Sequence, residues 1–179
     1  MISLGFDAST STVGYAFIED KKILSTGFID ISKVEGNRNK AWYVISEMVK
    51  NPLFDKVDTI NLEASLAGFS GANVVVMLAK WNAVFEYVLE EHFKKPINLI
   101  NVSTARKQAF GKARIKGIKP KPFVESEINK LYDMTPWIVY NKIKNIDKRC
   151  ADMYDAIVIG LYSPINDNPK RSNRSSKKT

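Results

Sequence analysis

Four acidic residues stand where their carboxylates could act together. Asp7 interrupts the apolar run near the start of the chain, and Glu63 ends the strand-like segment INLE. Asp152 and Asp155 are three residues apart in CADMYDA, so they share one face of a helix. Carboxylates that converge repel one another and raise each other's pKa unless a cation neutralises them. These acids therefore predict a cation site, provided that the fold brings their segments together.

The chemistry of such a site follows from its ligands. Oxygen clusters select hard cations such as Mg²⁺ or Mn²⁺. Two such ions about 3.5–4 Å apart can clamp the attacking and leaving oxygens of a phosphoryl displacement. The single histidine, His92, and the single cysteine, Cys150, exclude a zinc finger, a disulfide framework and a histidine-rich site. A site of carboxylates alone, hydrolysing phosphodiester bonds, needs neither residue.

Other interpretations of these residues stay open at this stage. The segment DASTSTVG resembles the phosphate-binding turn of actin-like or sugar-kinase-like ATPases, although such proteins duplicate their fold and 179 residues cannot hold two copies. Asp7 alone could be a turn cap, Glu63 a surface acid, and Asp152 with Asp155 a solvated helix face. Besides a phosphodiester hydrolase and an ATPase, the chain could be a DNA-binding module that no longer cleaves DNA. The retention of all four acids argues against this third possibility.

The positive charge of the chain is concentrated in one segment. The net charge is +8, and no acid occurs between His92 and Val124. That stretch contains nine cations: Lys94, Lys95, Arg106, Lys107, Lys112, Arg114, Lys116, Lys119 and Lys121. A surface that binds no polyanion usually mixes both signs, whereas a phosphate backbone gains affinity from clustered cations through counterion release. We therefore expect a nucleic acid as the partner.

Length and composition bound the class of protein. Apolar residues make up 45% and charged residues 26% of the chain, which is ordinary for a globular domain. We expect one domain over residues 1–163, followed by a basic, disordered tail over 164–179. The chain opens directly on a strand pattern, and no apolar run reaches the ~18 residues of a membrane span. These features predict a soluble cytoplasmic protein without membrane contact.

Apolar periodicity predicts five strands and five helices. The expected strands cover 2–7, 13–19, 23–31, 57–64 and 96–102. The expected helices cover 36–51, 71–93, 103–110 with Ser103 as N-cap, 122–132 starting at Pro122, and 149–162. A meander that feeds parallel strands favours an α/β fold, with a mixed sheet of order 3-2-1-4-5 and helices on both faces. That order would make strands one and four neighbours and bring Asp7 close to Glu63.

Four stretches resemble the RuvC family of Holliday junction resolvases, within the RNase H-like superfamily. They are LGFDASTSTVGYAFIE, INLEAS, VSTARKQAFGKARIKGIKPKPFV and ADMYDAIVIGLY. The resemblance implies an RNase H-like fold, a homodimer, and paired symmetric nicks in four-way DNA junctions that leave 5′ phosphates. It implies two Mg²⁺ ions per site, replaceable by Mn²⁺, with Asp7, Glu63, Asp152 and Asp155 as ligands and no nucleotide cofactor. Compact, diverged members are common in bacteriophages, and some accept a wider range of branched DNA.

The resemblance also assigns roles outside the acids. Lys107 and Lys121 fall where family members carry catalytic lysines near the scissile phosphate, and Arg106 and Lys119 are their neighbouring alternatives. The expected DNA-binding residues are Arg106, Lys107, Lys112, Arg114, Lys116, Lys119, Lys121 and Phe69. Phe69 is a candidate for the aromatic wedge at the crossover, with a core or loop aromatic as the alternative. The long helix 71–92 carries more apolar surface than one sheet can cover. The residues expected to face a second copy of the chain are Val76, Trp81, Ala83 and Tyr87.

Overall fold

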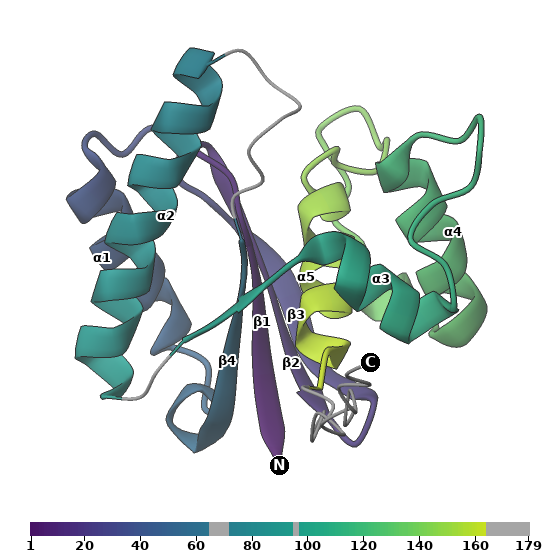
Figure 1. Ribbon diagram of the computed structural model, residues 1–179, viewed down its shortest axis with the longest axis horizontal. Helices are drawn as coiled ribbons and strands as arrows, with labels where there is room; N and C mark the ends of the chain where they lie inside the picture. Colours follow the sequence, from purple (N-terminus) through teal and green to yellow (C-terminus); the bar gives the residue numbers. More distant parts are fainter. Residues whose placement is uncertain (65–71, 95–96, 164–179) are drawn as a thin grey trace, which may run out of the picture.

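A computed structural model describes residues 1–64, 72–94 and 97–163 of the chain (Figure 1). Five strands form one sheet of order β3-β2-β1-β4-β5, as expected. The strands are β1 (Ile2–Ala8), β2 (Thr12–Glu19), β3 (Lys22–Asp30), β4 (Val57–Glu63) and β5 (Asn98–Ile100). The α-helices are α1 (Asn37–Met48), α2 (Ala72–Phe93), α3 (Val102–Phe110), α4 (Pro120–Leu131) and α5 (Cys150–Leu161), with short 3₁₀ turns at Phe54–Lys56 and Thr135–Trp137.

The sheet is an antiparallel meander extended by two parallel strands. β2 pairs antiparallel with both β1 and β3, while β4 pairs parallel with β1 and β5 pairs parallel with β4. Asp20 and Lys21 join β2 to β3 with positive φ angles of 47° and 62°. A two-residue turn of this kind matches the right-handed twist of the strands that it connects. The expected mixed α/β sheet is confirmed, including the parallel pairing of the strands that carry Asp7 and Glu63.

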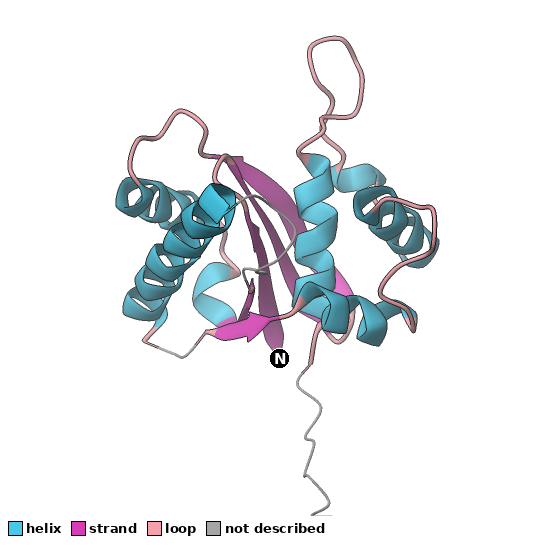
Figure 2. Ribbon diagram, turned by 45° about the horizontal axis from the view of Figure 1, so that its top comes forward, coloured by secondary structure: helices cyan, strands magenta, loops and turns pink. Residues whose placement is uncertain are grey.

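The sheet lies between two layers of helices. Figures 1 and 2 show α1 and α2 on one face, and α3, α4 and α5 on the other. On the first face Phe6 packs edge-on against Phe85, whose ring stacks on Trp81 at a centroid distance of 5.2 Å. On the second face α5 packs directly on β1 and β2, and its apolar residues share a separate core with α3 and α4. The sheet therefore separates two apolar cores.

Most element boundaries differ by one residue from the sequence-based expectation, and larger differences occur at α1, which ends at Met48 instead of residue 51, and at α4 and β5. The side chain of Asn101, rather than that of Ser103, caps α3 by accepting hydrogen bonds from the backbone N–H groups of Ser103 and Thr104 at 2.9 and 3.2 Å. The helix α4 begins at Pro120, two residues before Pro122, because Lys119 already has the extended backbone of an N-cap residue. The strand β5 is shorter than expected. Within the described ranges, no helix combines the length and apolar character needed to cross a bilayer.

Candidate active site

The close contact between α5 and the sheet sets the position of two of the four acids. Gly14 on β2 faces the backbone of Asp152, and Gly5 on β1 faces the backbone of Ala156 and Gly160. A Cβ atom on either strand glycine would overlap backbone atoms of α5. Only glycine permits this approach of two backbones. The first two turns of α5 are thereby held against the end of β1 that carries Asp7.

Four carboxylates from three elements meet at this end of the sheet. Asp7 lies opposite Gly14 in the β1–β2 ladder, and Glu63 is the last residue of the adjacent parallel strand β4. Asp152 and Asp155 follow in the first turns of α5, with only 8% and 5% of their surfaces exposed. The structure therefore brings together all four acids that the sequence singled out.

Asp7 and Glu63 are the most closely coupled of these acids. Burial raises the pKa of Asp7 well above its ordinary value, and the charges of Glu63, Asp155 and Asp152 raise it further. Burial also raises the pKa of Glu63, although a hydrogen bond with the Asp7 carboxyl opposes that rise. The two carboxyl groups thus lie within hydrogen-bonding reach of each other. Carboxylates buried this close together favour a shared proton or a bound cation.

A polar residue of α2 fixes the backbone at Glu63. The side-chain amide of Asn82 donates a hydrogen bond to the Glu63 carbonyl oxygen at 3.0 Å. Sequence reasoning did not single out Asn82. Its signal was an amide in the middle of a helix that is otherwise largely apolar. The bond ties the end of β4 to the helix that covers it.

Two cations from α3 and α4 pair with the acids of α5. The Arg106 guanidinium donates a hydrogen bond to Asp155 at 2.9 Å, and the Lys121 ammonium donates one to Asp152 at 2.5 Å. Burial raises the pKa of Asp155 despite the opposing charge of Arg106. Burial alone would lower the pKa of Lys121, but its hydrogen bond to Asp152 and the charges of Asp152, Asp7 and Asp155 together outweigh burial and leave the pKa raised. Lys121 therefore stays protonated at neutral pH.

The donor set suits a hard divalent cation. All of its ligand atoms are oxygens, and the raised pKa of Asp7 reflects negative charge that is only partly neutralised. Across the described part of the chain, no three acidic, histidine or cysteine side chains are already arranged as a metal cage. The oxygens of Asp152 and Asp155 are instead engaged by Lys121 and Arg106. A cation held by all four acids would have to compete with these two ion pairs.

The remaining cations of the basic segment lie at the surface. Lys107 is exposed, whereas its neighbour Arg106 points to the acids and has a side chain that is only 11% exposed. The other cations expected to bind DNA are exposed as well: Lys112, Arg114, Lys116 and Lys119. Phe69, the expected wedge, lies outside the described residues. The sequence could not distinguish Arg106 from Lys107, because both fit the same short cationic stretch.

The residues expected at a dimer interface divide into two groups. Val76, Ala83 and Tyr87 are exposed on α2, with Val76 and Tyr87 showing 52% and 62% of their surfaces. Trp81 is fully buried and stacks on Phe85, so its expected role in an interface is wrong. Trp42 on α1 lies beside Tyr87 in a surface groove of about 530 Å³ and was missed by sequence reasoning.

The fold has clear relatives among solved structures. Thermus thermophilus RuvC aligns with a TM-score of 0.58 and 12% identity over 90% of this chain and 92% of that one. The chain has the RuvC fold. A second Thermus thermophilus RuvC structure, in complex with a Holliday junction substrate, aligns with a TM-score of 0.57 and 11% identity over 90% of both chains.

A third similar structure comes from yeast. The yeast mitochondrial Holliday junction resolvase Ydc2 aligns with a TM-score of 0.53 and 16% identity over 88% of this chain and 75% of that one. No family model and no curated protein sequence matches the chain. At these identities the likeness to RuvC structures establishes the fold, and the activity must be argued from the residues.

Proposed function

We propose that the protein is a metal-dependent endonuclease that resolves four-way DNA junctions. The observation that carries this proposal is the meeting of Asp7, Glu63, Asp152 and Asp155 at one end of a RuvC-like sheet. The proposed products are paired symmetric nicks with 5′ phosphates. A Thermus thermophilus RuvC structure in complex with a Holliday junction substrate and the yeast mitochondrial Holliday junction resolvase Ydc2 share this fold, which supports branched DNA as the substrate class.

Asp7, Glu63, Asp152 and Asp155 would hold the metal ions, two Mg²⁺ in the proposed mechanism, with Mn²⁺ as a substitute. When bound, such ions activate a water molecule and stabilise the departing 3′ oxygen. The protein's own contribution is rigid support: Asp7 and Glu63 sit on paired strands, and α5 is fixed by its glycine contacts. Ligands on rigid elements keep their geometry more precisely than ligands on loops.

Lys121 and Arg106 have distinct proposed roles. Lys121 has a side chain that is 56% exposed and a raised pKa, so it can leave Asp152 and contact a DNA phosphate as a cation. A cation there would offset the charge that develops on the phosphate in the transition state. Arg106 is nearly buried and orients Asp155. Lys107 is proposed to contact the DNA backbone, as are the exposed cations that follow it.

A homodimer is the proposed assembly. A four-way junction has two-fold symmetry, which an isologous dimer can match. The groove between α1 and α2 is lined by Trp42, Tyr87 and Val88, and Val76 and Met77 continue the exposed apolar surface along α2. This surface lies on the face of the sheet opposite to α5. Dimerisation there would leave the acids open to DNA.

Cleavage of a synthetic four-way junction tests the proposed function. The purified protein should nick opposite strands in Mg²⁺ and should leave the junction intact in EDTA. The variant Asp7→Asn should bind the junction without cutting it, while the matched control Asp55→Asn, at the opposite end of the sheet, should cut normally. Intact junctions under every divalent cation, or tight ATP binding with turnover, would contradict the proposal and favour the kinase-like alternative.

A further inference from the structure

A hairpin over residues 139–147 projects from the molecule just before α5. Figure 2 shows this loop extending beyond the helices at the end of α5 that carries Asp152. Tyr140 and Ile146 form an isolated antiparallel bridge, and the backbone N–H of Asp147 donates to the Val139 carbonyl oxygen at 2.8 Å. The hairpin therefore has a paired stem and a defined tip.

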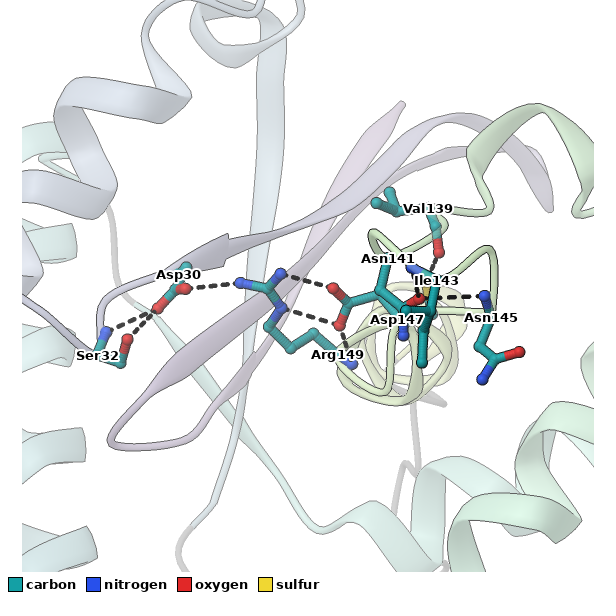
Figure 3. A network of polar contacts seen from close by, with 9 residues as sticks. Asp30, Ser32, Val139, Asn141, Ile143, Asn145, Asp147 and Arg149 are labelled. Atoms are coloured by element: carbon teal, nitrogen blue, oxygen red, sulfur yellow. Dashed lines mark hydrogen bonds and ion pairs between the residues drawn. The ribbon is translucent and has the colours of Figure 1, made fainter.

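The tip is ordered by hydrogen bonds around Asn141. Its side-chain oxygen accepts from the backbone N–H groups of Ile143 and Asn145 at 3.0 and 3.1 Å (Figure 3). The N–H of Asn141 donates to the Asn145 carbonyl oxygen, and Lys144 adopts a positive φ of 60° that closes the turn. These contacts fix the shape of the tip without any partner, so little conformational entropy is lost when it binds.

The base of the hairpin is attached to the sheet through Arg149. Its guanidinium donates two hydrogen bonds to Asp147, at 2.9 and 2.6 Å, and one to Asp30 at the end of β3, at 2.6 Å (Figure 3). Hydrogen bonds from the Arg149 side chain hold the pKa of Asp147 at about 2. The same guanidinium lies 4.8 Å above the Phe28 ring. The hairpin is thus braced against the sheet and against the start of α5.

The tip presents an apolar side chain between cations. Ile143 is 76% exposed and Tyr140 is 61% exposed. Lys142, Lys144 and Lys148 are exposed on either side of Ile143. The hairpin's one acid, Asp147, is buried and paired with Arg149, so the outward charge is positive. A partner that covered Ile143 would remove apolar surface from water, which is favourable. The tip therefore suits a partner that combines an apolar face with anionic groups.

Branched DNA has this combination at its branch point. The terminal base pairs of each arm expose flat apolar faces, and phosphates surround the opening. Isoleucine is one of the apolar side chains that proteins insert between base steps, while lysines bind phosphates with release of counterions. We propose that the 139–147 hairpin enters the branch point, with Ile143 against a terminal base pair and Lys142 and Lys144 on the flanking phosphates. This assignment rests on the proposed function and adds a contact that positions the junction relative to α5.

Binding measured without cleavage tests the hairpin. The full-length protein is titrated in EDTA with a four-way junction carrying 2-aminopurine at the branch point, and with a linear duplex of the same length. Ile143→Ser should weaken junction binding by about 5- to 10-fold, should leave duplex binding unchanged, and should abolish the fluorescence rise that reports unstacking. Lys142→Ala combined with Lys144→Ala should reduce the slope of log K against log salt by about 1.8.

Matched controls lie at the opposite end of the sheet. Val49→Ser changes an exposed valine at the C-cap of α1, and Lys56→Ala changes an exposed lysine just before β4; both variants should bind the junction as the wild type does. Thermal unfolding verifies that each variant is folded. If Ile143→Ser binds and unstacks the junction like the wild type, while the wild type still cleaves it, the hairpin assignment is overturned. The tip would then serve a protein partner, and the proposed function would stand. If the wild type neither binds nor cleaves branched DNA, both proposals fail.

Discussion

The Arg106 guanidinium lies 2.9 Å from an oxygen of Asp155, and both side chains are nearly buried. This pair links α3 to α5 and supplies, within the protein, a positive charge at the site that we expect to hold metal ions. The Nε atom of Arg106 is buried without a hydrogen-bond partner, so the pair is not fully satisfied. Buried ion pairs of this kind cost desolvation, and removing one partner leaves an uncompensated charge.

Arg106→Gln should therefore destabilise the metal-free protein by about 3 kcal/mol, because Asp155 would lose its cation. Urea denaturation in EDTA measures this loss. Mg²⁺ should restore more stability to Arg106→Gln than it adds to the wild type, since the ion then neutralises an unpaired carboxylate. A double-mutant cycle with Asp155→Asn isolates the pair. Equal effects of Mg²⁺ on both proteins would argue against a metal at Asp155.

Asp7→Asn should stabilise the metal-free protein at neutral pH. The folded-state pKa of Asp7 is raised by burial and neighbouring acids, so the folded state binds more protons than the unfolded state above pH 3.8. The free energy of unfolding of the wild type should therefore decrease as the pH rises above 3.8. That of Asp7→Asn should not show this decrease. The difference in Tm should be largest near pH 7 and should shrink towards pH 3.8, with about 2–4 °C expected per kcal/mol.

Asn61→Ala should lower stability by about 2 kcal/mol or more, because the Tyr162 carbonyl would lose its side-chain donor and the Ile159 carbonyl would keep only the backbone N–H of Tyr162. The Asn61 amide donates at 3.0 Å to the carbonyl oxygens of both Ile159 and Tyr162. Its own oxygen accepts from Asn98 at 3.1 Å. The half-exposed Asn98→Ala is the matched control and should cost about 1 kcal/mol. Equal losses in the two variants would contradict this view of Asn61.

Gly14→Ala should reduce cleavage by about 100-fold, because the added methyl group would push Asp152 away from the other acids. Single-turnover cleavage of the junction measures the effect. Gly27→Ala is the matched control on β3. Its Cβ would meet only the movable end of the Tyr15 side chain, at 2.8 Å from the hydroxyl oxygen, so cleavage should change little. Normal cleavage by Gly14→Ala would show that the α5 contact does not set the site.

Tyr87→Asp should convert the proposed dimer into a monomer, because it places a charge in the groove shared with Trp42. Sedimentation velocity across a range of protein concentrations gives the oligomeric state. Leu131→Asp changes a comparably exposed residue of α4, on the other side of the sheet, and should leave the state unchanged. A wild type that is monomeric at micromolar concentration would rule out this interface.

The four acids could be predicted from the sequence, because strand order alone brings Asp7 beside Glu63. The three-residue spacing of Asp152 and Asp155 fixes their common face. The pairing of Arg106 with Asp155 could not be predicted from the sequence. Adjacent cations on a short helix differ by about 100° in direction, and only packing decides which of them turns inward. Trp81 was misplaced for a related reason, since a helix that is apolar on most sides does not reveal which side is buried.

The 139–147 hairpin gave no usable signal in the sequence. A stem closed by one isolated bridge is too short for a period-two pattern to stand out from a loop. Its attachment depends on Arg149 reaching Asp30, a residue 119 positions away. Contacts over such separations follow from the assembled fold, and the local sequence does not encode them separately.

The separation of the two apolar cores by the sheet has an evolutionary consequence. Substitutions among the residues that pack α1 and α2 need no compensation among those that pack α5, because the two sets do not touch. The residues under α1 and α2 and those under α5 can therefore vary independently while the strand order persists. Independent variation on the two faces is compatible with a shared fold at low identity, as in the alignment with Thermus thermophilus RuvC over 90% of both chains at 11% identity.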